Sequence, residues 1–280
     1  MKDITDEELL RVLSEHCARL HRAAMEQAEA GFVETPDDPR WSYAFPLRSD
    51  LQLIHLFIQM ADAFDVAATS LRARTSAVGI GAIRFLAEGY VLIRWLAEPS
   101  NETERRKRAY RFALGCTIGT QGMLKHTADA DPRTMRSLAE SIQRLQQIAK
   151  EDGIQHVREA PKMDYLFKSY IAPGYVVFSS LSEIGSHPGL LQILVFYQDR
   201  RSRRIDVNLA GSHDERAAWL GAAYDFFGRS CDEIGKRFGW EEWLRETAVP
   251  LVREATPLMA EAKARWTAKW GLNRPTQPEP

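Results

Sequence analysis

The sequence predicts an all-α fold, a single bundle of about seven or eight helices with one small β-hairpin near residues 190–209. Apolar side chains recur at three- and four-residue spacing over most of the 280-residue chain, which indicates amphipathic helices. Prolines and glycines separate these segments, and the apolar content of 45% is typical of a globular protein. Because no flexible linker divides the chain, residues 1–272 are expected to form one domain, followed by a disordered tail at 273–280.

The predicted helices, in chain order, span residues 5–30, 49–73, 75–97, 102–127, 132–152, 175–187, 212–239 and 240–270. Two of them begin at a capping-box pattern, Thr5 with Glu8 and Ser212 with Glu215. The segments between the helices, including residues 31–46 and 161–173, contain prolines and are expected to be irregular.

Proline and strand-forming residues modify this pattern near the C-terminal end. The last helix is expected to bend at Pro250 or Pro257, because proline removes a backbone donor and crowds the preceding turn. The hairpin prediction rests on two apolar runs, LLQILVFYQ and IDVNLA, which flank the polar sequence DRRSRR.

The helix at 75–97 is apolar on most of its circumference and is therefore expected at the centre of the bundle, with its charges buried. Arg84 and Glu88 are four residues apart and can pair on the helix surface. This pair is either a structural ion pair or part of a catalytic site. Arg94 lies on another side of the helix, where it either extends into solvent or binds a ligand.

The helix at 175–187 carries the second polar group. Ser179, Glu183 and His187 recur every fourth residue and share one face, with Ser182 nearby. The helix C-terminus and Glu183 both favour the protonated form of His187. Such a histidine suits a general acid or an anion ligand, although a histidine that caps the helix by binding its last carbonyls has the same pattern.

Two basic clusters are candidates for binding phosphate, from RNA or from a nucleotide. One comprises Arg105, Arg106, Lys107, Arg108 and Arg111, and the other, at the hairpin tip, comprises Arg200, Arg201, Arg203 and Arg204. Acidic residues flank both clusters, so a solvated charged face is the alternative. The net charge of −1 excludes a global field that attracts nucleic acid.

Other classes of function are disfavoured by the absence of their motifs. No histidine has a glutamate three residues before it, which argues against a di-iron bundle, and the sequence predicts no metal or cofactor. Phosphate-binding loops and nucleophile elbows are also missing. The acidic N-terminus, the lack of an uninterrupted apolar span and three widely spaced cysteines, expected to be free and buried, favour a cytoplasmic protein that does not enter a membrane.

The segments AIRFLAEGYVLIRWLAEP and SLSEIGSHPG give a further indication. With the Arg-rich helix between them, they resemble bacterial all-helical proteins of unknown function that carry RxxxE and SExxHP. Some of those proteins are similar in outline to the HEPN superfamily, a resemblance that implies RNA cleavage without a metal by an Arg–His pair. Because His187 has no arginine at the usual spacing, its partner would come from another helix, such as Arg84.

Three hypotheses follow for the function. The first is a binding or regulatory protein, of a stress or phage response, with a polar pocket between the helices at 75–97 and 175–187. The second is a metal-independent ribonuclease in which His187, Arg84, Glu88 and Glu183 are catalytic, and Ser179, Ser182 and Arg94 bind the ligand. The third is a homodimer in which these polar residues are purely structural.

Overall fold

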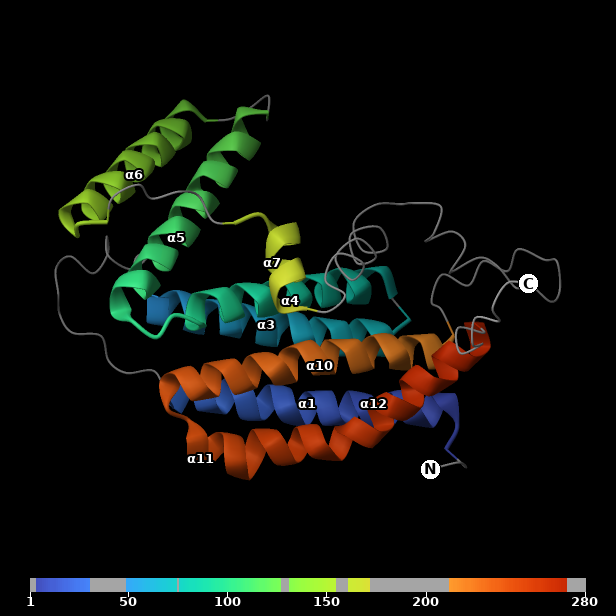
Figure 1. Cartoon of the computed structure of the whole chain (residues 1–280). Coiled ribbons are helices and arrows are strands. Elements are labelled where there is room, and N and C mark those ends of the chain that lie inside the picture. Colours follow the sequence, from blue (N-terminus) through green and yellow to red (C-terminus); the bar gives the residue numbers. More distant parts are fainter. Residues whose placement is uncertain are drawn as a thin grey trace, which may run out of the picture.

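The computed structural model describes residues 4–30, 49–74, 76–126, 131–154, 161–171 and 212–270. The prediction of an all-α fold is confirmed for these residues, which form helices and no strand (Figure 1). The predicted helix at 175–187, the hairpin near 190–209 and the tail at 273–280 lie outside the described residues.

Eight helices of eight residues or more occur in the described part of the chain. They are α1 Asp6–Ala30, α3 Ser49–Arg72, α4 Ser76–Ala97, α5 Glu102–Lys125, α6 Pro132–Glu151, α7 Met163–Tyr170, α10 His213–Phe238 and α12 Val249–Trp270. The short α11, Glu241–Trp243, and a π-helical segment η2, Leu244–Ala248, precede α12. The bounds of the first five predicted helices are correct to within two residues, but the prediction of an irregular segment at 161–173 is wrong, because α7 lies there.

Side chains at the helix starts explain several of these bounds. The Thr5 hydroxyl accepts a hydrogen bond from the Glu8 amide at 3.2 Å, as the first capping pattern predicts. Asn101 likewise caps α5. The second capping box is wrong: Ser212 occupies the N-cap position but makes no capping hydrogen bond with its side chain, and Glu215 is only 3% exposed. Glu215 is therefore buried in the bundle instead of lying at an exposed helix end.

The main core lies between α1, α3, α4, α10 and α12, which run alongside one another (Figure 1). Phe227 of α10 stacks on Phe57 and Phe64 of α3, with ring centroids 5.7 Å and 4.5 Å away. Arg216, 3% exposed, donates from Nη1 to the carbonyl of Leu71 at 2.8 Å. Because this bond satisfies a free carbonyl at the end of α3, it also fixes the start of α10 against that helix.

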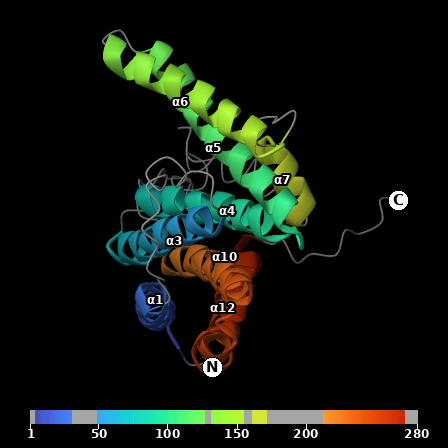
Figure 2. The ribbon, with the colours of Figure 1, turned by 90° about the vertical axis from the view of Figure 1, so that its left-hand side faces the viewer.

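The helices α5 and α6 form an antiparallel pair, here called the arm (residues 102–126 and 131–154), which rises away from the bundle in both views (Figures 1 and 2). The arm has a small hydrophobic core of its own, comprising Tyr110, Ala113, Leu145, Ala149 and Ile154. The Tyr110 hydroxyl donates to the Asp152 carboxylate at 2.5 Å. The base of the arm packs on α3 and α4, while α7 packs on α4 beside it.

The helix before Pro250 departs from regular α geometry, which refines the prediction of a bend at Pro250 or Pro257. Over Leu244–Ala248 the turns widen to π-helical geometry, and the Val249 amide bonds to the Leu244 carbonyl five residues back. A proline ring collides with the carbonyl four residues before it in a regular helix, and the wider turn removes that collision. Pro257 lies inside α12, which continues past it.

Among the described residues one helix, α3, has the length and apolar content of a membrane span. Most of its apolar stretch is buried inside the bundle. Its position at the centre of the core accounts for this composition without a membrane.

Candidate ligand pocket between α4, α5 and α7

The first predicted site residues, Arg84 and Glu88, pair as the sequence indicates, with Arg84 Nε and Glu88 Oε1 2.8 Å apart. Their side chains are 27% and 26% exposed, so the expectation that these charges are fully buried is wrong. Their side of α4 is not sealed in the core. The other members of the predicted catalytic and phosphate-binding sets lie outside the described residues, namely Ser179, Ser182, Glu183, His187, Arg200, Arg201, Arg203 and Arg204. The meeting of Arg84 with His187 stays a prediction.

Arg94 does not simply extend into solvent, which was one of its two expected roles. Its guanidinium pairs with the Glu233 carboxylate on α10, and its Cζ lies 5.9 Å from the ring centroid of Tyr170 on α7. Burial by itself would lower the pKa of Arg94, but the Glu233 carboxylate outweighs it and raises that pKa. Arg94 therefore links α4 to two other helices and stays charged.

Trp95, one residue further along α4, contacts two cations from the predicted basic cluster on α5. The Cζ atoms of Arg108 and Arg111 lie 5.6 Å and 5.4 Å from the indole centroid. Trp95 is 5% exposed, and a guanidinium held against a desolvated indole gains from cation–π attraction. These two arginines therefore pack against α4, and the binding of phosphate by their cluster stays a prediction.

Glu98, just after α4, connects three elements. Its Oε2 accepts hydrogen bonds from Arg108 Nη1 at 2.9 Å and from the Tyr170 hydroxyl at 2.8 Å. Arg108 also donates to the Trp95 carbonyl, which holds the base of α5 against the end of α4.

The protonation of this group follows from its contacts. Burial by itself would raise the pKa of Glu98, but the hydrogen bonds from Arg108 and Tyr170 outweigh it and lower that pKa. Burial first, and the Glu98 carboxylate second, raise the pKa of Tyr170 to about 12. At neutral pH the cluster therefore holds a carboxylate, a neutral phenol and a guanidinium.

These residues line a pocket of about 720 Å³, a volume in the usual range for small-molecule sites. The lining residues are Trp95, Glu98, Glu104, Arg108, Arg111, Pro161, Lys162, Asp164, Tyr165, Ser169 and Tyr170. Lys162, at the N-cap of α7, makes no ion pair with another described residue. Tyr165 is 61% exposed. The pocket thus combines cations, carboxylates and an accessible aromatic ring.

No protein-family model, curated protein or solved structure matches this chain. The function of the site is therefore inferred from its geometry.

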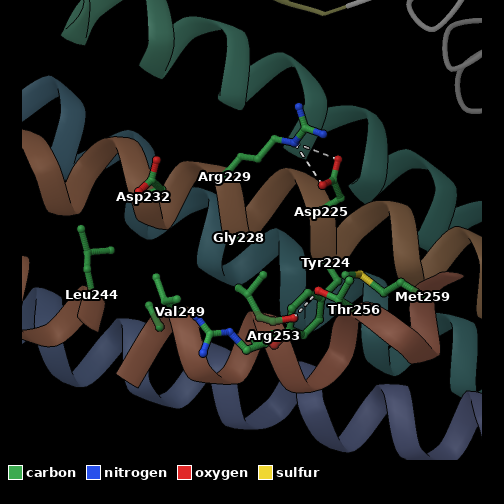
Figure 3. A pocket seen from close by; sticks show the side chains of 12 residues that line it. Tyr224, Asp225, Gly228, Arg229, Asp232, Leu244, Val249, Arg253, Thr256 and Met259 are labelled. Atoms are coloured by element: carbon green, nitrogen blue, oxygen red, sulfur yellow. Dashed lines mark hydrogen bonds and ion pairs between the residues drawn. The ribbon is translucent and has the colours of Figure 1, made fainter. Parts of the chain in front are cut away.

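A second hollow, of about 440 Å³, lies between α10 and the η2–α12 segment (Figure 3). Leu244, Val249 and Val252 contribute apolar side chains to its lining. Three of its charged groups are already paired, since Arg229 Nε lies 3.0 Å from Asp225 and Asp232 pairs with Lys236. This groove offers a ligand fewer polar contacts than the pocket beside the arm.

The described part of the chain provides little evidence for a metal site or a catalytic thiol. No group of three or more His, Cys, Asp or Glu side chains with the geometry to hold a metal occurs there. Cys17 and Cys231 are free and buried, as expected, but Cys116 on α5 is exposed, which corrects the expectation that it is buried. Its helix lies in the arm, away from the main core.

Several residues of the pocket were missed from the sequence. The basic run on α5 was visible, but its partners Glu98 and Tyr170 carry no motif. A pairing pattern within one helix would have been detectable. Here the contacts join three different helices, α4, α5 and α7, and the sequence pattern of residues 161–173 predicts an irregular segment where α7 lies.

Proposed function

We propose that this protein is a helical binding module whose pocket between α4, α5 and α7 takes a nucleotide. The observation that carries the proposal is the placement of Arg108 and Arg111 against Trp95, in a pocket whose lining also includes Lys162. An arginine already held by an indole and a carboxylate loses little conformational freedom when it binds a phosphate. RNA ends carry the same phosphate and base, so they belong to the same ligand class.

The remaining lining residues favour a nucleotide over a bare phosphate ion. Tyr165 presents an exposed ring on which a base can stack. Glu104 and Asp164 supply acceptors for ribose hydroxyl and base amino groups. Their negative charge repels a free phosphate ion, which has no ribose or base whose contacts could offset that repulsion.

Calorimetric titration of the full chain with AMP, ADP and inorganic phosphate tests the proposal. AMP and ADP are expected to bind, and to bind more tightly than inorganic phosphate. Lys162→Ala removes one charge-assisted contact and is expected to weaken ADP binding about tenfold. Lys125→Ala removes an exposed lysine near the tip of the arm, outside the pocket, and serves as the matched control.

The same titrations can overturn the proposal. Failure of both nucleotides to bind excludes the nucleotide class. Equal weakening by Lys162→Ala and Lys125→Ala excludes the pocket as the site, since a general loss of positive charge then explains the effect.

A metal-independent ribonuclease is the second candidate, favoured by the partly exposed Arg84–Glu88 pair on α4. In this proposal His187 acts as acid or base beside Glu183, and Arg84 stabilises a phosphate oxyanion. RNA degradation by the wild type is compared with His187→Ala and Arg84→Ala. Equal degradation by all three proteins, or none by any of them, excludes this activity.

A further inference from the structure

The arm is joined to the bundle at its base, and the contacts that join it are also contacts of the pocket. Within the described residues α6 packs mainly on α5, and the arm keeps a small core separate from the main one. The chain enters the arm through the short segment at 98–101. At about 1.5 Å per residue, the helices of the arm extend roughly 30 Å, so a small rotation at the base moves the tip by a larger distance.

Among the described residues, few polar contacts join the base of the arm to the bundle. Gln52 of α3 donates to the Ala109 carbonyl at 3.0 Å, and Arg108 bonds to the Trp95 carbonyl and to Glu98. All of these contacts fall in the first two to three turns of α5. Glu98 also accepts a hydrogen bond from the hydroxyl of Tyr170, so α7 belongs to the same cluster of contacts.

We infer that Glu98 is a latch that sets the angle of the arm, and that a nucleotide in the pocket closes the arm onto α7. The second part rests on the proposed function. A ligand that contacts both Arg111 on α5 and Lys162 at the start of α7 links these two helices. Such a link favours the closed arrangement by the difference in binding free energy between closed and open states. The angle of the arm then depends on whether the pocket is occupied, and a partner that contacts the arm can distinguish the two states.

A matched pair of carboxylates at the base of the arm separates this role from a general effect of charge. Glu98 connects different elements, whereas Glu102 pairs with Arg105 and Arg106 of its own helix. Glu98→Gln therefore weakens the attachment of the arm to α4 and α7. Glu102→Gln removes the same charge close to the same base, outside the lining of the pocket, and leaves Glu98 bound to Arg108 and Tyr170.

The experiment measures the distance between spin labels at Lys125→Cys, near the tip of the arm, and Glu242→Cys, on α11, by pulsed electron resonance. The exposed Cys116 is first replaced by serine, while the buried Cys17 and Cys231 remain. Glu98→Gln is expected to broaden the distance distribution, AMP to narrow it in the wild type, and Glu102→Gln to leave it unchanged. Circular dichroism melting checks that each variant is folded.

Three results overturn all or part of the inference, and they can be told apart. If Glu98→Gln gives the wild-type distribution, Glu98 is not a latch. If calorimetry shows AMP binding and the distribution does not narrow, the coupling is wrong and the binding function stands. If neither AMP nor ADP binds, the proposed function itself is overturned, and the closing step with it.

Discussion

The guanidinium of Arg94 pairs with the carboxylate of Glu233, 139 residues away in the sequence, and the same guanidinium faces the ring of Tyr170. One side chain thus joins α4, α10 and α7 next to the pocket. Its contacts are partly shielded from water, which distinguishes it from the exposed ion pairs on α1 and α5.

Loss of this pair is expected to destabilise the fold. Arg94→Ala should lower the free energy of unfolding by about 1 kcal/mol, measured in urea, because it removes a partly buried ion pair and a cation–π contact. Arg245→Ala, which breaks an exposed pair with Glu246, should change it by less than about 0.5 kcal/mol. A double-mutant cycle with Glu233→Gln checks the partner, and strictly additive effects would show that the two residues do not interact.

The lowered pKa of Glu98 makes its contribution depend on pH. A carboxyl group whose pKa is lower in the folded than in the unfolded state stabilises the fold above the unfolded pKa, and this contribution is lost as the pH falls through the folded value. Wild type is therefore expected to be more stable than Glu98→Gln at pH 7, and the difference should shrink towards pH 3. Unfolding curves across this range measure it. A difference that stays constant or grows in acid contradicts the assigned role.

The arm is expected to open locally more easily than the bundle. Its separate core is small, so amides of α6 should exchange with deuterium faster than those of α10. Tyr110→Phe removes the hydrogen bond to Asp152 and should speed exchange in α6 about fivefold, with no change in α10. Tyr165→Phe, at an exposed position on α7, is the control. Equal acceleration in α6 and α10 would mean that the arm and bundle unfold together.

The three cysteines should differ in reactivity. Desolvation by neighbouring atoms raises the pKa of all three thiols. Cys17 and Cys231 are buried, whereas Cys116 is exposed to solvent. One thiol per chain is expected to react with a disulfide reagent in native buffer, and three in denaturant. Cys116→Ser should abolish the native reaction. Reaction of a second thiol in the native protein would contradict the burial of Cys17 or Cys231.

The sequence determined what depends on neighbours along the chain. Apolar spacing located the helices α1 and α3 to α6, and the Arg84–Glu88 pair was predictable because residues four apart on a helix are adjacent in any fold. Local pattern also misled, since Ser212 and Glu215 have capping spacing while Glu215 is buried by the bundle.

Tertiary structure alone decided the pocket. Trp95, Arg108 and Tyr170 come from three helices, and nothing in their spacing fixes how those helices pack. The same holds for Glu98, whose two hydrogen-bond partners are 10 and 72 residues away. Helical periodicity specifies which face of a helix is apolar, but the partner of that face is chosen by the shape and charge of the whole assembly.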